Sequence, residues 1–264
     1  MDRLDTLESL SVYILREAYA RARPLAMLWS IGKDSNVVLW LARKAFFGRV
    51  PFPVVQLDTG LELDEVYAYS DRYAKEWDLE LVVIDCPPES EMDPSLPPMT
   101  RSAARKSAGL ANLLTDGAYK GILVGIRRDE EATRAKERVF SPRATDGRWE
   151  YRDQPAEFWG QFTTDTPENA HLRIHPLLHW TEIDVWRYTQ RENIPVNPLY
   201  FAQDGKRYRS LGEKNITVPV DSDAATIDEI IQELEITKKP ERAGRLMDNE
   251  AEDSFERLRT SGYM

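Results

Sequence analysis

The hydrophobic pattern of the chain alternates between short apolar runs and longer stretches with helical spacing. The apolar runs are typical of buried parallel strands, and we predict strands at 25–29, 54–57, 81–84, 122–124 and 172–174. Stretches with apolar positions three and four residues apart predict helices near 1–23, 34–47, 61–77, 101–119, 182–192, 224–235 and 251–259.

This alternation of strand and helix is typical of an α/β fold. Right-handed crossovers then give a doubly wound, mostly parallel, five-stranded sheet with helices on both faces. We predict that residues 1–200 form this domain, and that residues 201–264 form an irregular and helical extension that packs near the active site. Ligands of such sheets bind beyond the carboxyl ends of the strands. The residues that directly follow each strand are therefore the candidates for chemistry.

The first strand leads into Ser30–Ser35, which reads Ser-Ile-Gly-Lys-Asp-Ser, and then into a helix. Such a turn places backbone N–H groups and two hydroxyls around the positive end of the helix, where phosphate binds. Gly32 lets the backbone approach a ligand closely, and Lys33 supplies a mobile cation. The glycine spacing differs from that of a Walker loop. The alternative is an ordinary strand–helix junction capped by Ser and Asp.

Other strand ends also carry polar segments. Asp58–Gly60 follows the second strand, and Gly125–Glu131 follows the fourth. Eight Arg or Lys residues lie between Arg127 and Arg152, which indicates either a site for a small anion or a solvated basic face. The segment 138–168 has little periodicity and is predicted to be a long active-site loop.

Composition and charge narrow the class of protein. The 264 residues are 42% hydrophobic, which is typical of a globular protein, and no apolar run reaches the roughly 18 residues of a membrane span. The single cysteine excludes an internal disulfide, so we expect a cytoplasmic protein without membrane association. The net charge of −10 disfavours direct nucleic-acid binding without a partner.

Several motifs in the same order resemble one family. They are Ser30–Ser35, Leu57–Gly60, Arg127–Arg138, Pro176–Trp186, Glu192–Ile194, Pro198–Tyr200 and Glu241–Arg245. The chain resembles the PP-loop ATP pyrophosphatases that include the phosphoadenylyl-sulfate (PAPS) reductases, and in particular the small catalytic subunit of bacterial ATP sulfurylase (sulfate adenylyltransferase subunit 2). The resemblance implies cleavage of ATP between the α- and β-phosphates, with Mg²⁺, and transfer of the adenylyl group to sulfate. It also implies a GTPase large subunit as partner.

The resemblance implies a role for each matching residue. The catalytic residues would be Lys33, Arg127, Arg128 and Arg134. The nucleotide-binding residues would be Ser30, Gly32, Asp34, Ser35, Asp58, Thr59, Gly60, Gly125, Arg138, Arg242 and Arg245. The four-residue spacing of Arg134 and Arg138 would place both on one helical face that closes over the anion. Asp129 and Glu130 would hold the metal ion or orient the arginines.

The chain also departs from the family pattern. Adenylyltransferases of this family usually carry a longer segment after the Pro-Leu-Tyr motif and then Arg-x-Arg-x-Leu-Gly-Cys, whereas here Glu213 stands at the cysteine position. The C-terminal cysteine motif of the reductases is absent, which excludes reduction by a tail thiol. The alternative function is sulfur insertion, such as DNA phosphorothioation, in which Cys86 accepts sulfur from a cysteine desulfurase. Cys86 is otherwise a small core residue.

The three histidines lie close together in the sequence. His171, His175 and His179 are spaced by four, as in a helical metal site, but Pro176 interrupts any helix there. We therefore expect structural roles for them.

Overall fold

The computed structural model describes residues 2–115, 118–144, 149–152, 154–165, 170–239 and 241. The strands of its main sheet are β1 (Leu25–Leu28), β2 (Val54–Asp58), β3 (Leu81–Asp85), β4 (Gly121–Leu123), β5 (Phe140–Ala144) and β6 (Ala170–Ile174). The α-helices are α1 (Arg3–Arg21), α2 (Lys33–Ala45), α3 (Asp64–Glu76), α4 (Pro98–Leu114), α5 (Glu182–Glu192) and α6 (Ile227–Ile236). The short elements are η1 (Glu89–Glu91), η3 (Ala132–Lys136), η4 (Pro198–Tyr200), β7 (Lys206–Arg207) and β8 (Val220–Asp221).

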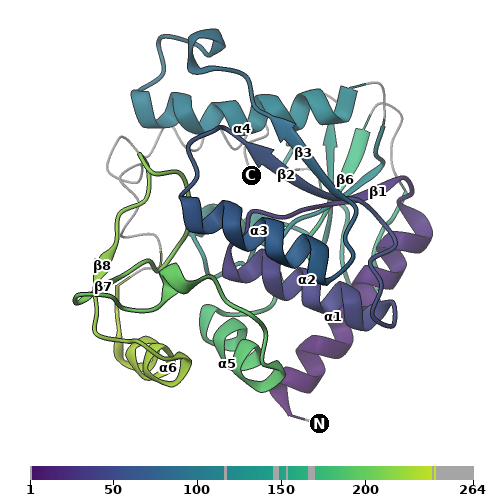
Figure 1. Ribbon diagram of the computed structural model, residues 1–264. Helices are drawn as coiled ribbons and strands as arrows, with labels where there is room; N and C mark the ends of the chain where they lie inside the picture. The colour runs from purple at the N-terminus through teal and green to yellow at the C-terminus, as the bar shows by residue number, and fades with distance from the viewer. Residues whose placement is uncertain are drawn as a thin grey trace.

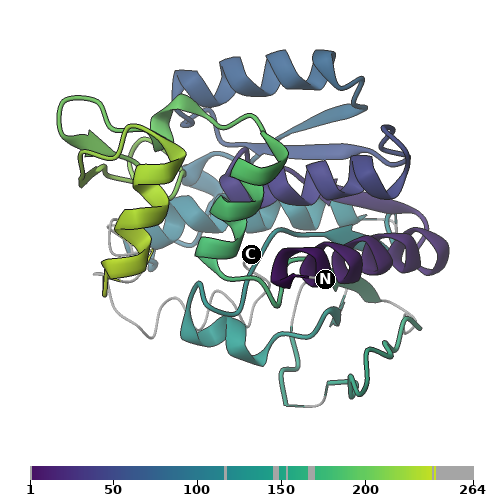
Figure 2. The same cartoon turned by 90° about the horizontal axis from the view of Figure 1, so that it is seen from below.

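The sheet is doubly wound, as predicted. Its strand order is β3-β2-β1-β4-β6-β5, and every neighbouring pair except β5–β6 is parallel. The chain moves outward from β1 to β3 and then returns to β4 on the other side of β1. Because each crossover is right-handed, the return places α4 on the face opposite α2 and α3 (Figure 1). Seen from below, α1 and α5 lie beside α2 (Figure 2).

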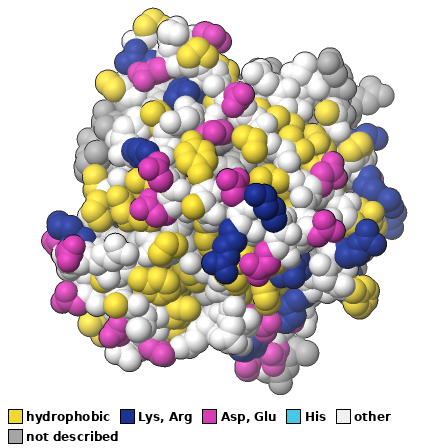
Figure 3. Space-filling model, in the orientation of Figure 1, with side chains coloured by type: hydrophobic (Ala, Val, Ile, Leu, Met, Phe, Trp, Pro, Cys, Tyr) yellow, Lys and Arg dark blue, Asp and Glu magenta, His cyan; other side chains and the backbone are white. Residues whose placement is uncertain are grey.

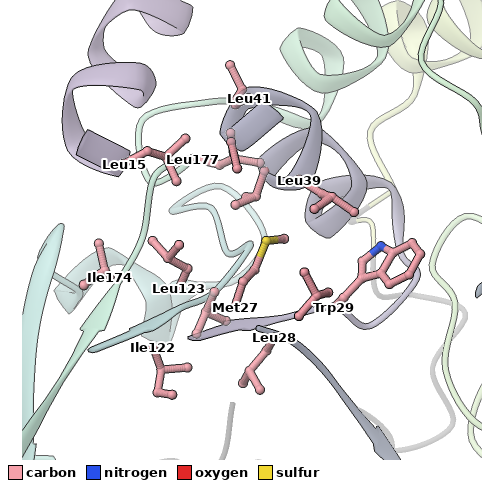
Figure 4. Close-up of a cluster of buried hydrophobic side chains, with 14 of the residues drawn as sticks. Leu15, Met27, Leu28, Trp29, Leu39, Leu41, Ile122, Leu123, Ile174 and Leu177 are labelled. Carbon is pink, nitrogen blue, oxygen red and sulfur yellow. The ribbon is translucent and has the colours of Figure 1, made fainter. Parts of the chain in front are cut away.

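The core lies on both faces of the central strands. Every residue of β1 is buried, which explains its continuous apolar sequence. Met27 and Leu123 point toward α2, whereas Leu28 and Ile122 point to the opposite face (Figure 4). Burying each such side chain contributes about 1.5–3 kcal/mol relative to leaving it exposed. The central strands therefore hold the loops at their carboxyl ends in fixed positions.

The prediction of five strands was wrong by one strand. β5 lies inside the segment expected to be a loop and pairs antiparallel with β6 at the edge of the sheet. Its sequence contains Pro142, and its Arg143 is buried, so it lacks the apolar pattern of a strand. Proline is tolerated there because an edge strand has one side that needs no ladder hydrogen bonds.

The expectation of a shared helical face for Arg134 and Arg138 was also wrong. η3 is a 3₁₀-helix that ends at Lys136, and Glu137 after it has extended backbone angles. Arg138 therefore leaves the helix, and its Nε donates to the carbonyl oxygen of Pro155 at 3.2 Å.

The topology creates a switch point between β1 and β4. These two strands are adjacent in the sheet. From β1 the chain continues through α2 to β2 on one side, and from β4 it continues to β5 and β6 on the other side, which opens a crevice beyond the carboxyl ends of β1 and β4. The segment Ser30–Ser35 and Gly125 both lie at this crevice. The fold thus brings together two motifs that lie about 90 residues apart in the sequence.

Two surface properties follow from the described residues. No helix among them combines the length and the apolar character needed to cross a bilayer. On the face drawn in Figure 3, Lys and Arg side chains are mixed with Asp and Glu.

Two of the three histidines are buried near β6. Burial lowers the pKa of His171 to about 3 and that of His175 to about 4. His175 Nδ1 donates to the carbonyl oxygen of Arg138 at 2.7 Å, which joins the end of β6 to the segment before β5. Among the described residues, no group of three His, Cys, Asp or Glu side chains is arranged to hold a metal ion.

We expect the free energy of unfolding to fall as the pH is lowered from about 6.5 to about 4. In this range the unfolded chain binds a proton at His175 that the folded protein does not bind. His175→Asn, which retains a hydrogen-bond donor near the Nδ1 position, should remove a pH-dependent contribution of about 3 kcal/mol. Urea unfolding at a series of pH values measures this effect. Gln203→Asn, which changes no titratable group at an exposed position, is the control, and an unchanged slope in His175→Asn would contradict the assignment.

Candidate active site

The site begins at the turn from β1 into α2. Ile31 is fully buried and has a φ of 61°, a left-handed conformation that costs a residue other than glycine about 1–3 kcal/mol. Gly32 then precedes α2 with an extended backbone and no side-chain cap. The backbone N–H of Lys33 donates to the hydroxyl of Tyr200 in η4 at 2.8 Å. A helix N-terminus with backbone donors thus faces the crevice, as the sequence predicted.

The two hydroxyls of the turn lie next to each other. Ser30 Oγ is 3.2 Å from Ser35 Oγ, and Ser35 Oγ donates to the carbonyl oxygen of Gly32 at 3.0 Å. Gly125 packs directly against the same turn of α2. A Cβ on Gly125 would lie 2.9 Å from the backbone nitrogen of Ser35, so only glycine fits without a shift of the helix.

A buried network of hydrogen bonds connects the turn to α3 and to the segment after α5. Trp29 Nε1 donates to Asn36 Oδ1 at 2.6 Å, and Asn36 Nδ2 donates to Tyr69 Oη at 3.1 Å. Tyr69 in turn donates to the carbonyl oxygen of Pro195 at 2.7 Å. Because each of these bonds is buried or partly buried, the network fixes the start of α2 relative to α3 and the segment after α5.

Two of the four predicted catalytic cations, Lys33 and Arg127, lie in a buried ion cluster rather than in open solvent. Lys33 Nζ contacts Asp34 at 3.2 Å and pairs with Glu241. Arg127 is completely buried and pairs with Asp34, with Glu241 and, at 2.9 Å, with Asp129. We call Lys33, Asp34, Arg127, Asp129 and Glu241 the ion cluster. Two cations thus face three carboxylates.

The pairing keeps Lys33, Arg127 and Glu241 charged. Burial alone would lower the pKa of Lys33, but the carboxylates of Asp34 and Glu241 outweigh it and raise that pKa. Burial likewise opposes the charge of Arg127, and the same two carboxylates raise its pKa. For Glu241, burial would raise the pKa, and the opposing effect of Arg127 and Lys33 lowers it well below the usual range.

One cavity joins most of these elements. We call it the switch-point cavity. It is lined by Leu28, Ser30, Gly32–Ser35, Ala103, Lys106, Val124–Ile126, Glu130, Arg134, Tyr200, Ser210–Glu213, Ile216 and Glu241. The cavity therefore includes most of the positions predicted at the ends of β1 and β4.

Other predicted residues lie away from this cavity. Arg128 Nη1 is 2.9 Å from His179 Nδ1, and its Nη2 donates to the carbonyl oxygen of Glu137 at 3.2 Å. Asp58 accepts hydrogen bonds from the N–H of Gly60 and from Tyr67, both at 2.7 Å, and so closes its own turn. Thr59 is buried, and its carbonyl oxygen accepts a bond from Arg105 at 2.8 Å.

Two further predicted residues, Arg242 and Arg245, lie outside the described residues.

The two candidate metal ligands differ in their surroundings. Asp129 accepts from Arg127 and, at 2.8 Å, from the backbone N–H of Glu182 at the start of α5. Its carboxylate thus orients Arg127 and caps a helix. Glu130 lines the switch-point cavity instead, as does Asp34.

The structure adds residues that the sequence analysis did not select. Tyr200 and Glu241 contact Lys33 directly, and Lys106 and Glu213 also line the cavity. Tyr200 and Glu241 belong to motifs that carried the family resemblance, so the motifs themselves were the available signal. Nothing in the sequence pointed to Lys106, because it lies in the middle of an amphipathic helix.

Comparisons with known proteins identify the relatives of the chain. The model of the phosphoadenosine phosphosulfate reductase domain matches residues 24–219. Sulfate adenylyltransferase subunit 2 of Rhizobium johnstonii is 38% identical over 295 aligned positions, which cover 98% of this chain and 92% of the relative. The protein of the same name from Colwellia psychrerythraea is 37% identical and covers 100% of this chain and 99% of the relative. Because both alignments are longer than the chain, these relatives carry residues that it lacks.

Solved structures share the fold at low sequence identity. Candida glabrata FMN adenylyltransferase in complex with ATP has a TM-score of 0.59 at 17% identity, covering 92% of this chain and 88% of that one. The PAPS reductase of Candida auris has a TM-score of 0.51 at 14% identity, covering 83% of this chain and 98% of that one.

We expect Glu241→Gln to bind inorganic pyrophosphate at least about tenfold more tightly. The substitution removes one of the three carboxylates that face Lys33 and Arg127, so the cluster of two cations loses one negative charge and repels an incoming anion less. The variant should also lose about 3 kcal/mol of stability, because a buried ion cluster loses one partner. Isothermal titration calorimetry and urea unfolding measure the two effects. Glu235→Gln, in an exposed ion pair with Arg187, is the control, and weaker pyrophosphate binding in Glu241→Gln would contradict the interpretation.

Proposed function

Because the chain belongs to the sulfate adenylyltransferase subunit 2 family, within the phosphoadenosine phosphosulfate reductase domain family, we propose that it transfers the adenylyl group of ATP to sulfate. A sulfate oxygen attacks the α-phosphorus, the bond to the β-phosphate oxygen breaks, and pyrophosphate leaves. The products are adenylyl sulfate and pyrophosphate. The alignments cover 92% and 99% of these two relatives. This coverage supports proposing the whole reaction for this chain.

The observation that carries the proposal is the position of the helix α2 N-terminus in the switch-point cavity. Ser30, Ser35 and the first residues of α2 line the space between the ends of β1 and β4, and the N–H of Lys33 donates to Tyr200, which lines the same space. A helix N-terminus attracts phosphate through its dipole and its free donors. In this arrangement the β- and γ-phosphates of ATP would lie at the turn, where the leaving group needs stabilisation.

The charged side chains would supply the remaining stabilisation. Adenylyl transfer depends mainly on positioning and on neutralising charge, rather than on covalent chemistry by the protein. Lys33 lines the cavity and would exchange its contact with Glu241 for one with phosphate. Arg134 lies at the cavity wall and would face the sulfate or the α-phosphate. Arg127 is completely buried, and its ion pair with Asp34 would hold Asp34 and the turn in place.

The residues also fit a magnesium ion that enters with ATP. Mg²⁺ is usually held by one or two carboxylates together with substrate phosphates, rather than by a complete protein cage. Asp34 and Glu130 line the cavity and would hold the ion, whereas Asp129 is not among the residues that line it. When bound, the ion would neutralise charge on the phosphate oxygens.

A second subunit is part of the proposal. The relatives are named as subunit 2 of sulfate adenylyltransferase, which implies a larger partner subunit for them. We propose that this chain also works with such a subunit, and the assays below therefore include it.

The alternative function, sulfur insertion through Cys86, receives less support. The thiol is buried next to Gly109, where a Cβ would lie only 2.8 Å from the sulfur. Burial raises the pKa of Cys86 to about 11, so little reactive thiolate forms at neutral pH. A persulfide would need one more sulfur atom in this tightly packed place.

We expect Lys33→Ala to reduce adenylyl sulfate formation by at least about a hundredfold, because a cation at the leaving phosphates is lost. The assay uses ATP, Mg²⁺ and sulfate with the partner subunit, and follows adenylyl sulfate and pyrophosphate. Lys75→Ala, an exposed substitution on α3, is the control. Unchanged turnover in Lys33→Ala, or ADP and phosphate as products, would reject the proposed reaction.

We expect Cys86→Ala to retain adenylyl sulfate formation within about twofold, since the buried thiol has no role in the proposed reaction. In parallel, the protein is incubated with a cysteine desulfurase and cysteine, and persulfide on Cys86 is sought by mass spectrometry. Absence of adenylyl sulfate in the wild type, together with persulfide at Cys86, would favour the alternative instead.

A further inference from the structure

The α4 side of the switch-point cavity carries its own buried charges. Glu213 is 2% exposed, and its Oε2 accepts a hydrogen bond from Ser102 of α4 at 2.7 Å. Lys106, one helical turn further along α4, pairs with Glu62 at 2.5 Å and lies 3.7 Å from Glu213 Oε1. Two buried carboxylates thus share this lysine.

One oxygen of this group is left without a hydrogen bond. Glu213 Oε1 is buried and has no hydrogen-bond partner among the described residues, although Lys106 gives it partial charge compensation. Leaving a buried charged acceptor unsatisfied costs more than an ordinary hydrogen bond returns. Since Glu213 also lines the cavity, a ligand with a hydrogen-bond donor on this side would remove the cost.

The lining residues therefore differ in what they can bind. The start of α2 contributes Lys33 and the hydroxyls of Ser30 and Ser35, which suit phosphate, whereas the α4 side and the segment 210–216 contribute the acceptor Glu213 together with apolar Ala103, Leu211 and Ile216. ATP has the complementary polarity. Its phosphates are acceptors, and its nucleoside carries donors on the ribose hydroxyls and on the base amino group.

We propose that Glu213 is a specificity-determining residue that accepts a hydrogen bond from the nucleoside of ATP. This inference rests on the proposed function for the identity of the nucleotide. Ser102 is a positioning residue, because its bond to Oε2 fixes the orientation of the Glu213 carboxylate. A thiol at this position, as in the pattern Arg-x-Arg-x-Leu-Gly-Cys, would be a far poorer acceptor.

The test measures nucleotide binding by isothermal titration calorimetry, without sulfate, for the wild type, Glu213→Gln, Glu213→Cys and Ser102→Ala. The ligands are ATP, 2′-deoxy-ATP, 3′-deoxy-ATP, inosine triphosphate and pyrophosphate. Glu213→Cys should bind ATP about ten- to a hundredfold more weakly, as expected for a lost bond to a charged acceptor, whereas Glu213→Gln, whose amide oxygen still accepts, and Ser102→Ala should show intermediate losses. Pyrophosphate affinity should not change. Glu91→Gln, at an exposed position, is the control.

The analogues identify the donor. The analogue that lacks the group bound by Glu213 should bind equally to the wild type and to Glu213→Cys. Equal losses for all nucleotides and for pyrophosphate, or unchanged ATP affinity in both variants, would overturn the inference, as would a wild type that does not bind ATP. If the wild type shows this nucleoside dependence but forms no adenylyl sulfate with its partner and sulfate, the proposed function fails while the role of Glu213 stands.

Discussion

The mutual neutralisation of Lys33, Arg127, Asp34 and Glu241 is the interaction on which the site depends. Each of these charges alone would be costly to bury, and together they compensate one another at the junction of β1, β4 and the C-terminal part of the chain. The cluster links the turn after β1 to a residue more than 200 positions later. It also means that a phosphate reaching Lys33 competes with a carboxylate of the protein itself.

Close packing fixes the geometry around these charges. Gly125 allows the end of β4 to touch the first turn of α2, and the left-handed Ile31 turns the chain sharply between strand and helix. The bonds from Trp29 through Asn36 to Tyr69 hold that turn from the other side. In a preorganised donor site of this kind, little rearrangement is needed when charge develops in a reaction. Strain at Ile31 is offset by the surrounding core.

The polarity of the cavity connects the proposed function to the inference about Glu213. Donors gather at the α2 turn because a helix begins there, and an acceptor lies on the α4 side because Ser102 and Lys106, on one face of α4, hold Glu213. A nucleotide carries its phosphate acceptors at one end and the donors of its nucleoside at the other. Its orientation in such a cavity follows from charge and hydrogen bonding before any detailed contact is considered.

The sequence by itself determined the parallel sheet, because buried central strands such as β1 need continuous apolar runs and the helices between them need periodic ones. It also located the turn Ser30–Ser35, since a strand–turn–helix junction is a local structure. Only the tertiary structure decided that β5 pairs at the edge, because Pro142 and the buried Arg143 give it no strand pattern. Only the tertiary structure placed Glu241 on Lys33 and Glu213 in the cavity, because pairings between distant segments depend on topology and not on local spacing.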